Sequence, residues 1–354
     1  MKVWKTKLFM KYTVLPSTDI KVSKLCLGTM TFGNQNTEAE GHAQMDLALE
    51  RGINFFDTAE LYPVPATAKT YAQTERIIGT WFKKTRNRDK VVLASKIVGG
   101  GAYTAHIRDH DMFSPKHLRE ALEGSLKRLN TDYLDLYQLH WPERKANFFS
   151  VRGYKGHPDK DPWEDNFEAI LATLAELIEE GKIKHIGLSN ETPWGIHRCL
   201  QLAEKGYPKM ITVQNPYSLL NRLFEVGNSE MCMREGMGLL AYSPLGFGRL
   251  TGKYRNGMPE NSRFKLFPNL ARFNGDNSIL ATDEYYKIAQ EFNLSLTQMA
   301  LAFVTNRPFV TSNIIGATNL EQLEENIASV DVDLSKEVLK AIEVVQERIP
   351  NPAP

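Results

Sequence analysis

Cysteine is scarce in this sequence, and charge of one sign is not in excess. The 354 residues include three cysteines, Cys26, Cys199 and Cys232, which lie far apart and form no CxxC pair. This excludes a disulfide framework for a chain of this size and favours a reducing compartment, so a cytoplasmic protein is expected. The 43 Lys and Arg residues nearly equal the 42 Asp and Glu residues. Without a positive field, nucleic acid is not an expected partner.

Long hydrophobic runs are absent too. No apolar stretch reaches membrane-spanning length, and the first ten residues carry three lysines but no signal-peptide core. We therefore expect no membrane association. A second methionine, Met10, opens a strand-like stretch, so residues 1–9 are treated as an N-terminal extension and residues 10–354 as one domain.

What the sequence does have is a regular alternation. From Leu25 onward, short apolar runs alternate with longer segments of helical period, which predicts βαβ units and an α/β protein. Eight runs are predicted as strands: Leu25–Leu27, Ile53–Asp57, Val91–Lys96, Leu134–His140, Ile183–Ser189, Ile211–Asn215, Gly238–Tyr242 and Val310–Gly316. Eight strands, each followed by a crossover, fit a closed (β/α)8 TIM barrel better than an open doubly wound sheet.

Helix signals fall between these strands. Thr37 with Glu40 forms a capping box, and Ser114 followed by Pro115 is typical of a helix start. Helical periodicity covers Asn166–Glu180, Pro193–Lys205 and Asn319–Ser329, and Gly52 and Gly181 mark helix ends.

Four segments lie outside the repeat. They are a hairpin at Tyr12–Val22, long loops at Trp141–Asp165 and Ser243–Asp283 after the fourth and seventh strands, and a last helix at Ser335–Arg348. Loops this long in a compact domain are usually functional or disordered. The first loop carries four aromatic residues, Phe148, Phe149, Tyr154 and Trp163. It is interpreted either as a wall of a substrate pocket or as a surface excursion with its own aromatic cluster.

Polar residues stand where three consecutive strands end. Asp57, Lys96 and His140 close strands two to four, and Tyr62 follows Asp57 by five residues. Singly, each has a structural explanation, since Asp57 can cap a turn and His140 can be a satisfied interior histidine. Together they would be costly to bury without a function, and all four are expected at one barrel mouth.

These residue types suit proton donation to a carbonyl oxygen. Tyr62 is the predicted general acid, and the cation of Lys96 is expected to lower its reference pKa of about 10 by about 1 to 3 units. Asp57 would hold the ammonium group, and His140 would hydrogen-bond the substrate oxygen.

Carbonyl reduction also needs a hydride, which no side chain supplies, so a bound cofactor is expected. The predicted phosphate site combines the run Ser243-Pro244-Leu245-Gly246-Phe247-Gly248, the cations Lys253 and Arg263, and the helix start after Gly316-Ala317-Thr318. Backbone N–H groups, cations and a helix dipole all favour phosphate. The glycine run alone misses the GxGxxG spacing, and a plain turn is an equal alternative.

Several segments carry a family resemblance: FFDTAELY, LASK, LYQLHWP, GLSN, VQNPYS, AYSPLGFGRLTGKY and GATNLEQLEENI. Over nearly its whole length the chain resembles the aldo-keto reductase superfamily. The segments GTMTFGNQN, AELYPVP, LSNETPWG and QNPYSLLNR are most similar to the bacterial Tas-type branch and, more distantly, to potassium-channel β subunits. The resemblance implies a catalytic tetrad of Asp57, Tyr62, Lys96 and His140, and NADPH-dependent reduction of small aldehydes or ketones.

The resemblance also implies cofactor contacts. Ser189, Asn190 and Gln214 would hold the nicotinamide carboxamide, with Tyr242 stacked on the ring. The other implied contacts are Thr29, Met30, Gln35 and Asp57, then Ser243, Pro244, Leu245, Gly246, Lys253 and Arg263 along the pyrophosphate, and Gly316, Thr318, Gln322, Glu325 and Asn326 at the adenosine end.

One departure concerns the choice of nucleotide. Many relatives carry a lysine and an arginine around the ribose phosphate, where this chain has Gly316 and Gln322. Selectivity would then depend on Arg263, Lys253 and the helix start at Thr318. NADP(H) is the expected cofactor, with NADH as the alternative.

Two other functions compete with carbonyl reduction. A cofactor-binding regulatory subunit is one, although the channel branch typically has asparagine where this chain has His140. A barrel that binds a phosphorylated ligand without redox chemistry is the other. No metal is expected: His106 and His110 have the i, i+4 spacing of a zinc helix, but glycines precede them and Ser114-Pro115 follows. The sequence predicts neither the individual substrate nor the oligomeric state.

Overall fold

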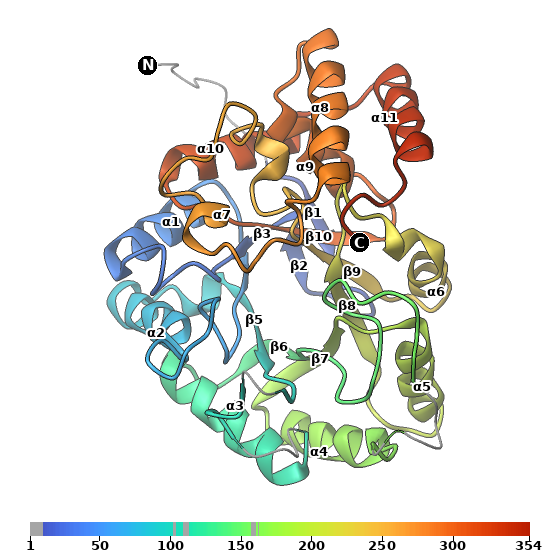
Figure 1. The fold of residues 1–354 in the computed structure, drawn as a ribbon. Coiled ribbons are helices and arrows are strands. Elements are labelled where there is room, and N and C mark those ends of the chain that lie inside the picture. Colours follow the sequence, from blue (N-terminus) through green and yellow to red (C-terminus); the bar gives the residue numbers. More distant parts are fainter. Residues whose placement is uncertain (1–9, 102–103, 109–112, 157–160, 162) are drawn as a thin grey trace.

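Eight short strands pair side by side in parallel and close into a barrel (Figure 1). The computed structural model describes residues 10–101, 104–108, 113–156, 161 and 163–354. In order around the barrel, the strands are β10 (Val310–Ile315), β3 (Leu25–Gly28), β4 (Phe55–Asp57), β5 (Val92–Ile97), β6 (Leu134–Leu139), β7 (Ile183–Ser189), β8 (Met210–Pro216) and β9 (Gly238–Tyr242). The predicted TIM barrel is confirmed.

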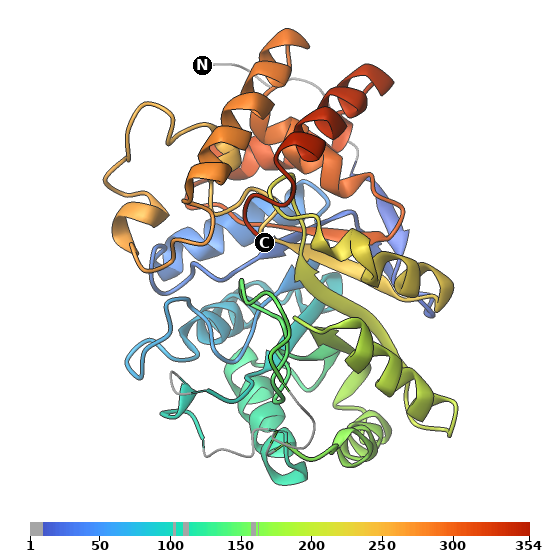
Figure 2. The ribbon, with the colours of Figure 1, turned by 45° about the vertical axis from the view of Figure 1, so that its right-hand side comes forward.

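Helices form a layer outside the strands (Figures 1 and 2). They are α1 (Glu38–Glu50), α2 (Gln73–Thr85), α3 (Pro115–Leu129), α4 (Phe167–Glu179), α5 (Pro193–Ala203), α6 (Asn228–Arg234), α7 (Arg263–Leu266), α8 (Asp276–Glu291), α9 (Leu296–Thr305), α10 (Leu320–Ala328) and α11 (Lys336–Arg348). Within the described part of the chain, none of these helices combines the length and apolar character that crossing a bilayer requires.

The predicted strand boundaries hold to within two residues. The largest shift is at β4, which begins at Phe55 rather than Ile53. Strand β6 ends at Leu139, which leaves His140 as the first residue of the following loop. Local start signals are also confirmed, because Thr37 and Glu40 form a reciprocal capping box and Ser114 caps α3. Residues 1–9 lie outside the described residues, so the predicted domain division stays a prediction.

One predicted boundary is wrong. The predicted loop Ser243–Asp283 contains α7 and the first two turns of α8. Helix α8 buries the polar residues Ser278 and Thr282 while Ile279 and Leu280 remain exposed. At the start of α8 the buried face is thus polar and the exposed face apolar. The apolar residues therefore do not mark the buried face, and the sequence pattern does not predict this part of the helix.

The predicted N-terminal hairpin closes one end of the barrel. Strands β1 (Tyr12–Val14) and β2 (Lys21–Ser23) pair in antiparallel fashion. Val22 of β2 and Leu15, which follows β1, are fully buried and pack on barrel-interior side chains near the strand starts, such as Cys26 and Phe55. The long loops lie at the opposite end of the barrel, where the strands finish.

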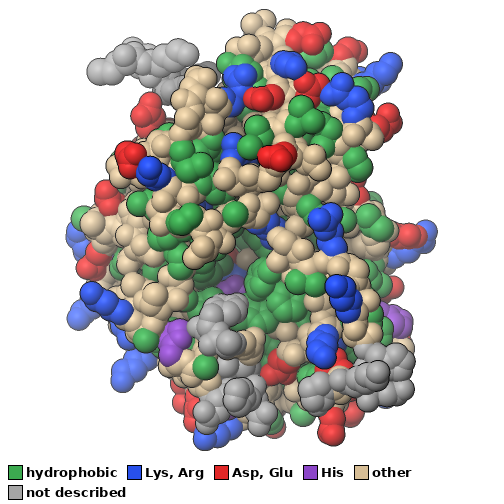
Figure 3. Space-filling view, viewed as in Figure 1, with side chains coloured by type: hydrophobic (Ala, Val, Ile, Leu, Met, Phe, Trp, Pro, Cys, Tyr) green, Lys and Arg blue, Asp and Glu red, His purple; other side chains and the backbone are tan. Residues whose placement is uncertain are grey.

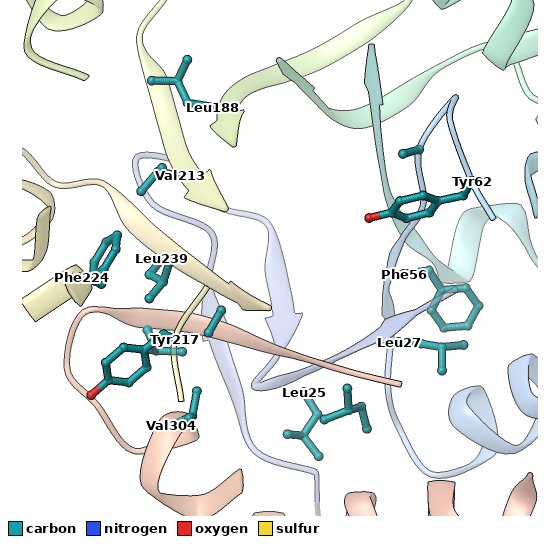
Figure 4. Packing of buried hydrophobic residues seen from close by; sticks show 14 of the residues in the cluster. Leu25, Leu27, Phe56, Tyr62, Leu188, Val213, Tyr217, Phe224, Leu239 and Val304 are labelled. Atoms are coloured by element: carbon teal, nitrogen blue, oxygen red, sulfur yellow. The ribbon is translucent and has the colours of Figure 1, made fainter. Parts of the chain in front are cut away.

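A larger apolar cluster fills the space between the strands and the helices. Figure 4 shows part of it, including Leu27 and Phe56, which pair across β3 and β4. Helices α2 and α3 approach so closely here that a Cβ atom on Gly79 would lie 2.0 Å from the carbonyl oxygen of Arg128. The packing of these two helices therefore requires glycine at position 79.

Replacing this glycine tests the packing. In a helix interior, alanine is normally more stable than glycine by about 1 kcal/mol. We nevertheless expect Gly79→Ala to lower the free energy of unfolding by about 1–3 kcal/mol, because the α3 backbone must move. Gly124→Ala in α3 is the control, since its added methyl meets only the flexible end of Arg128. Urea denaturation measures the free energy of unfolding of both variants. The prediction is contradicted if Gly79→Ala is as stable as Gly124→Ala, or more stable than the wild type.

Candidate active site

Strand alternation brings polar side chains to the open mouth of the barrel. Phe55, Ala94 and Leu136 belong to the interior apolar layer of three adjacent strands. Two residues further along, on the same face, the strands carry Asp57, Lys96 and Gln138. The register pairs Lys96 directly with Gln138. Polar groups therefore form the layer next above the apolar interior.

Lys96 and Asp57 form a buried ion pair in this layer. The Nζ atom of Lys96 lies 2.7 Å from Oδ2 of Asp57, and their side chains are 0% and 2% exposed. Nζ also donates to the carbonyl oxygen of Thr58 at 2.8 Å. Because removing either charge would leave the other uncompensated, the two side chains hold each other in place.

The other oxygen of Asp57 is held by two amides. Oδ1 accepts from Nε2 of Gln214 at 2.8 Å and from Nε2 of Gln138 at 3.3 Å. Gln214 was predicted as a cofactor contact, whereas Gln138 was missed. Its position two residues before His140 in the predicted strand Leu134–His140 was the available signal, since such residues share a face. The main-chain carbonyl of Asp57 accepts from the hydroxyl of the predicted residue Thr29 at 2.8 Å.

Tyr62 lies over this pair, on the loop after β4. The Nζ atom of Lys96 is 4.9 Å from the centre of its ring, and the ring of His140 meets it edge-on at 5.7 Å. Asp57, Tyr62, Lys96 and His140 are thus gathered at one mouth. Burial raises the pKa of Tyr62 well above its usual value, and the carboxylate of Asp57 adds to the rise. The expected net lowering of this pKa is therefore wrong, because burial and the Asp57 carboxylate both act in the opposite direction.

His140 faces the same space as a neutral ring. Burial lowers its pKa well below the usual value, and the cation of Lys96 lowers it further. Its Nδ1 atom is buried without a hydrogen-bond partner. The carbonyl oxygen of His140 accepts from Nδ2 of Asn190 at 2.9 Å, which ties the end of β6 to that of β7. A neutral imidazole here can donate or accept one hydrogen bond to a ligand.

The predicted nicotinamide contacts surround this group. The hydroxyl of Ser189 donates to the carbonyl oxygen of Gln214 at 2.9 Å. The phenol of Tyr242 donates to Oδ1 of Asn190 at 2.6 Å. Asn190 itself has a positive φ of 54°, a conformation that asparagine tolerates better than most residues. The structure therefore brings all four predicted residues to the mouth.

The predicted phosphate residues of the long loop form a second group. A tight turn joins Ser243 and Gly246, whose N–H donates to the Ser243 carbonyl at 2.9 Å and whose φ is +53°, with Pro244 and Leu245 between them. The guanidinium of Arg263 lies 4.7 Å from the centre of the Phe247 ring and 4.0 Å from the sulfur of the predicted residue Met30.

The cations Lys253 and Arg263 form no ion pair with the residues that the structure describes. The Nε atom of Arg263 is buried without a hydrogen-bond partner, and burial lowers the pKa of this guanidinium to about 10. Burial also lowers the pKa of Lys253, and the charge of Arg263 adds to this effect. Two cations that destabilise each other in this way would both gain from a bound anion.

The predicted adenosine residues cluster at the start of α10. Oε1 of Gln322 accepts from the Thr318 N–H at 3.0 Å, and Nδ2 of Asn326 donates to the Gly316 carbonyl at 3.1 Å. Glu325 points elsewhere, because its carboxylate accepts from Ser295 at the start of α9 at 2.7 Å. The predicted residue Gln35 precedes Asn36, whose amide donates to the Thr318 carbonyl at 2.9 Å.

The histidine pair considered for a metal cannot be compared with the prediction, since His110 lies outside the described residues. In the described ranges, no cluster of three His, Cys, Asp or Glu side chains has the arrangement of a metal site.

The aromatic residues of the loop after β6 line a cavity of about 950 Å³ beside the mouth. Phe148, Phe149, Tyr154 and Trp163 all contribute to its wall. Of the two interpretations of this loop, the pocket wall is therefore the one with structural support.

Comparison with known proteins identifies the group to which these features belong. The model of the aldo/keto reductase family matches residues 24–347. The chain belongs to the aldo/keto reductase family. As a member of it, the protein is an oxidoreductase with relatives along its full length.

Three similar proteins illustrate the range of this family. Protein tas of Escherichia coli is 48% identical over 353 residues, covering 98% of this chain and 100% of that protein. An uncharacterized oxidoreductase, YrpG, of Bacillus subtilis is 34% identical over 94% of this chain and 95% of its own. A probable voltage-gated potassium channel subunit beta of rice is 32% identical over 96% of this chain and 98% of its own. The predicted Tas-type resemblance of this aldo/keto reductase is confirmed, as is the more distant channel-subunit resemblance.

The neutral state of His140 predicts a pH dependence of stability. Its pKa in the folded protein is below the unfolded value of about 6.5, so below that pH the unfolded state binds more protons. The free energy of unfolding should fall as the pH drops through 6.5 towards the folded pKa. Urea denaturation between pH 8 and pH 5 measures this slope. We expect His140→Gln to have a smaller slope, and an unchanged slope would contradict the assignment.

Proposed function

We propose that this aldo/keto reductase is a cytoplasmic, NADP(H)-dependent enzyme that reduces the carbonyl group of small aldehydes or ketones to an alcohol. The observation that carries the proposal is the buried pair of Lys96 and Asp57 beneath the rings of Tyr62 and His140. The nicotinamide would supply the hydride. The side chains would supply the proton and orient the carbonyl.

Tyr62 is proposed as the proton donor. Its raised pKa keeps the phenol protonated at all ordinary pH values, so it can donate a hydrogen bond to the carbonyl oxygen. As the carbonyl carbon gains hydride, its oxygen becomes an alkoxide, a much stronger base than a phenolate. The phenolic proton then moves to that oxygen, and the phenolate is later reprotonated from water. A pKa lowered in advance is therefore not required.

Lys96 and His140 support this transfer in different ways. The ammonium of Lys96, 4.9 Å from the Tyr62 ring, stabilises the phenolate that remains. Asp57, whose Oδ2 lies 2.7 Å from Nζ, holds that ammonium in position beneath the ring. A neutral His140 can donate one hydrogen bond to the substrate oxygen and fix its direction towards Tyr62.

The residues present fit a nicotinamide nucleotide. Ser189, Asn190 and Gln214 offer hydroxyl and amide groups beside the Asp57 carboxylate, as a carboxamide requires. Lys253 and Arg263 offer cations for its phosphates, and the buried Nε of Arg263 has no partner. Selectivity for NADPH over NADH would depend chiefly on these two cations, because Gly316 and Gln322 contribute no charge.

A regulatory, cofactor-binding role is the second candidate. The similarity to the rice channel subunit favours it, since the matched region covers nearly all of both chains. Against it stands His140, which completes a set of four catalytic residue types at the mouth. The two functions differ in turnover, because a regulatory subunit would bind the nucleotide with little steady-state reduction. A barrel that binds a phosphorylated ligand without redox chemistry would not bind nicotinamide.

The decisive test replaces the proton donor. We expect Tyr62→Phe to lower kcat for aldehyde reduction by at least about 100-fold, because the general acid is lost. Nucleotide affinity should change little, since the ring remains. NADPH oxidation followed by absorbance and quenching of nicotinamide fluorescence measure the two effects. Tyr207→Phe, which removes an exposed hydroxyl bonded to Glu168, is the control. Equal turnover in Tyr62→Phe and the wild type would refute the assignment.

A second test addresses nucleotide selectivity. We expect Arg263→Gln to weaken NADPH binding by about 10- to 100-fold, the usual cost of a lost charge-assisted hydrogen bond, and to weaken NADH binding less. Lys265→Gln, an exposed cation of the same helix paired with Glu260, is the control and should leave both affinities unchanged. Isothermal titration with each nucleotide measures the ratio. An unchanged ratio in Arg263→Gln would show that selectivity lies elsewhere.

A further inference from the structure

The cavity beside the mouth is larger than a small aldehyde requires. Its volume is about 950 Å³, near the upper end for sites that hold small molecules. The loop after β6 forms one side of it, and residues following β7 and β8 form the other. Figure 3 shows this face of the molecule, with hydrophobic side chains around a central hollow.

Ring contacts and shared residues join the cavity to the proposed catalytic residues. Phe149 lines the cavity and lies 5.7 Å from the ring of Trp141, which lies 4.8 Å from the ring of His140. Asn190 also lines the cavity and donates to the carbonyl oxygen of His140. The wall of the cavity therefore adjoins the proposed carbonyl site.

Aromatic side chains dominate the apolar part of the wall. Phe148 and Phe149 meet edge to face at 5.0 Å, and Trp163 and Trp194 do so at 6.2 Å on the wall. Rings in this arrangement offer both faces and edges to a flat ligand. Two of them, Phe149 and Trp194, are 42% and 51% exposed, so they are free to cover one. The wall fits a planar, aromatic molecule of two or more rings.

One cation on this wall has no anionic partner among the described residues. Arg144 is committed, because its guanidinium donates to both carboxylate oxygens of Glu191. Arg272 also lines the cavity, but it makes no ion pair with any residue in the described ranges, and its Nε atom is buried without an acceptor. Its guanidinium lies within hydrogen-bonding reach of the neutral phenol of Tyr242, and it opposes the rise that burial causes in the pKa of that phenol. This partly buried cation therefore sits between the cavity and the mouth.

The other charged side chains of the wall are of both signs. With Arg144 and Glu191 set aside as a pair, the charged side chains described on the wall are Lys145, Arg152, Arg272 and Asp161. Lys145 and Arg152 are exposed, so their fields are screened by solvent. Arg272 is the one held against the ring of Phe273, with its guanidinium 5.3 Å from the ring centre. Its planar group is thereby oriented, which favours a specific partner.

We propose that Arg272 makes this enzyme selective for planar aromatic carbonyl compounds that carry a carboxylate, with the rings held in the aromatic cavity and the carboxylate bound to the guanidinium. The inference rests on the proposed carbonyl reduction and names its substrate class. A carboxylate matches the single guanidinium in charge and geometry. A phosphate, with up to two negative charges, would call for further buried cations, and none of the other cations described on this wall is both buried and unpaired.

Two aldehydes of equal ring size provide the kinetic test. We expect Arg272→Gln to lower kcat/KM for 6-carboxy-2-naphthaldehyde by at least about 10-fold, the usual effect of a lost charge-assisted hydrogen bond, and that for 2-naphthaldehyde by less than about threefold. Arg152→Gln, which removes an exposed cation from the same wall, should change kcat/KM for each of the two aldehydes by less than about threefold. Equal losses for the two aldehydes in Arg272→Gln, or equal discrimination in both variants, would overturn the proposal.

Binding without turnover separates this inference from the proposed function. Isothermal titration with 2-naphthoate and its neutral amide should show tighter binding of the carboxylate in the wild type, and this preference should disappear in Arg272→Gln. If no carbonyl compound is reduced but this preference is found, the proposed reduction fails while the carboxylate site stands. If both aldehydes are reduced and no preference is found, the inference fails alone. NADPH affinity weakened more than about threefold in Arg272→Gln would overturn it as well, because Arg272 would then be a nucleotide contact.

Discussion

The buried ion pair of Lys96 and Asp57 is the constraint on which the rest of the mouth depends. Taking two charges out of water costs several kcal/mol for each, and the attraction between them compensates only if their other hydrogen-bonding sites are filled. The carbonyl of Thr58 and the amides of Gln138 and Gln214 fill those sites. A network that must be complete to be stable is also rigid, so it can hold the phenol and imidazole above it in one geometry.

The same pair explains why the acidity of Tyr62 departs from the simple expectation. A lone ammonium 4.9 Å from the ring would lower the pKa of the phenol, but the carboxylate 2.7 Å from that ammonium acts in the opposite direction. Burial then dominates and raises the pKa. Reasoning from residue types identified the partners but not this balance, because the sign of the net shift depends on distances and burial that a sequence does not contain.

Most of the fold could be predicted from the sequence because strands and helices have different periods. The strand ends at or near Asp57 and Lys96 follow from short apolar runs between segments of helical period, and the eightfold repeat predicts the barrel. The start of α8 could not, since its buried face carries Ser278 and Thr282. Gln138 was missed for a related reason, because one amide inside a buried strand has no chemical signature until the carboxylate it contacts is known.

The two parts of the mouth have different physical origins. Asp57 and Lys96 stand on strands, whose hydrogen-bonded register fixes them relative to one another, and Tyr62 lies over them on the loop after β4. The wall of the cavity comes largely from the loop after β6 and from Arg272 in the loop after β9, where insertions and substitutions disturb no strand pairing. A barrel built in this way can keep one reaction while the loops change the substrate. The residues on and beside the strands therefore indicate the reaction, whereas the substrate class is inferred from the residues of the loops.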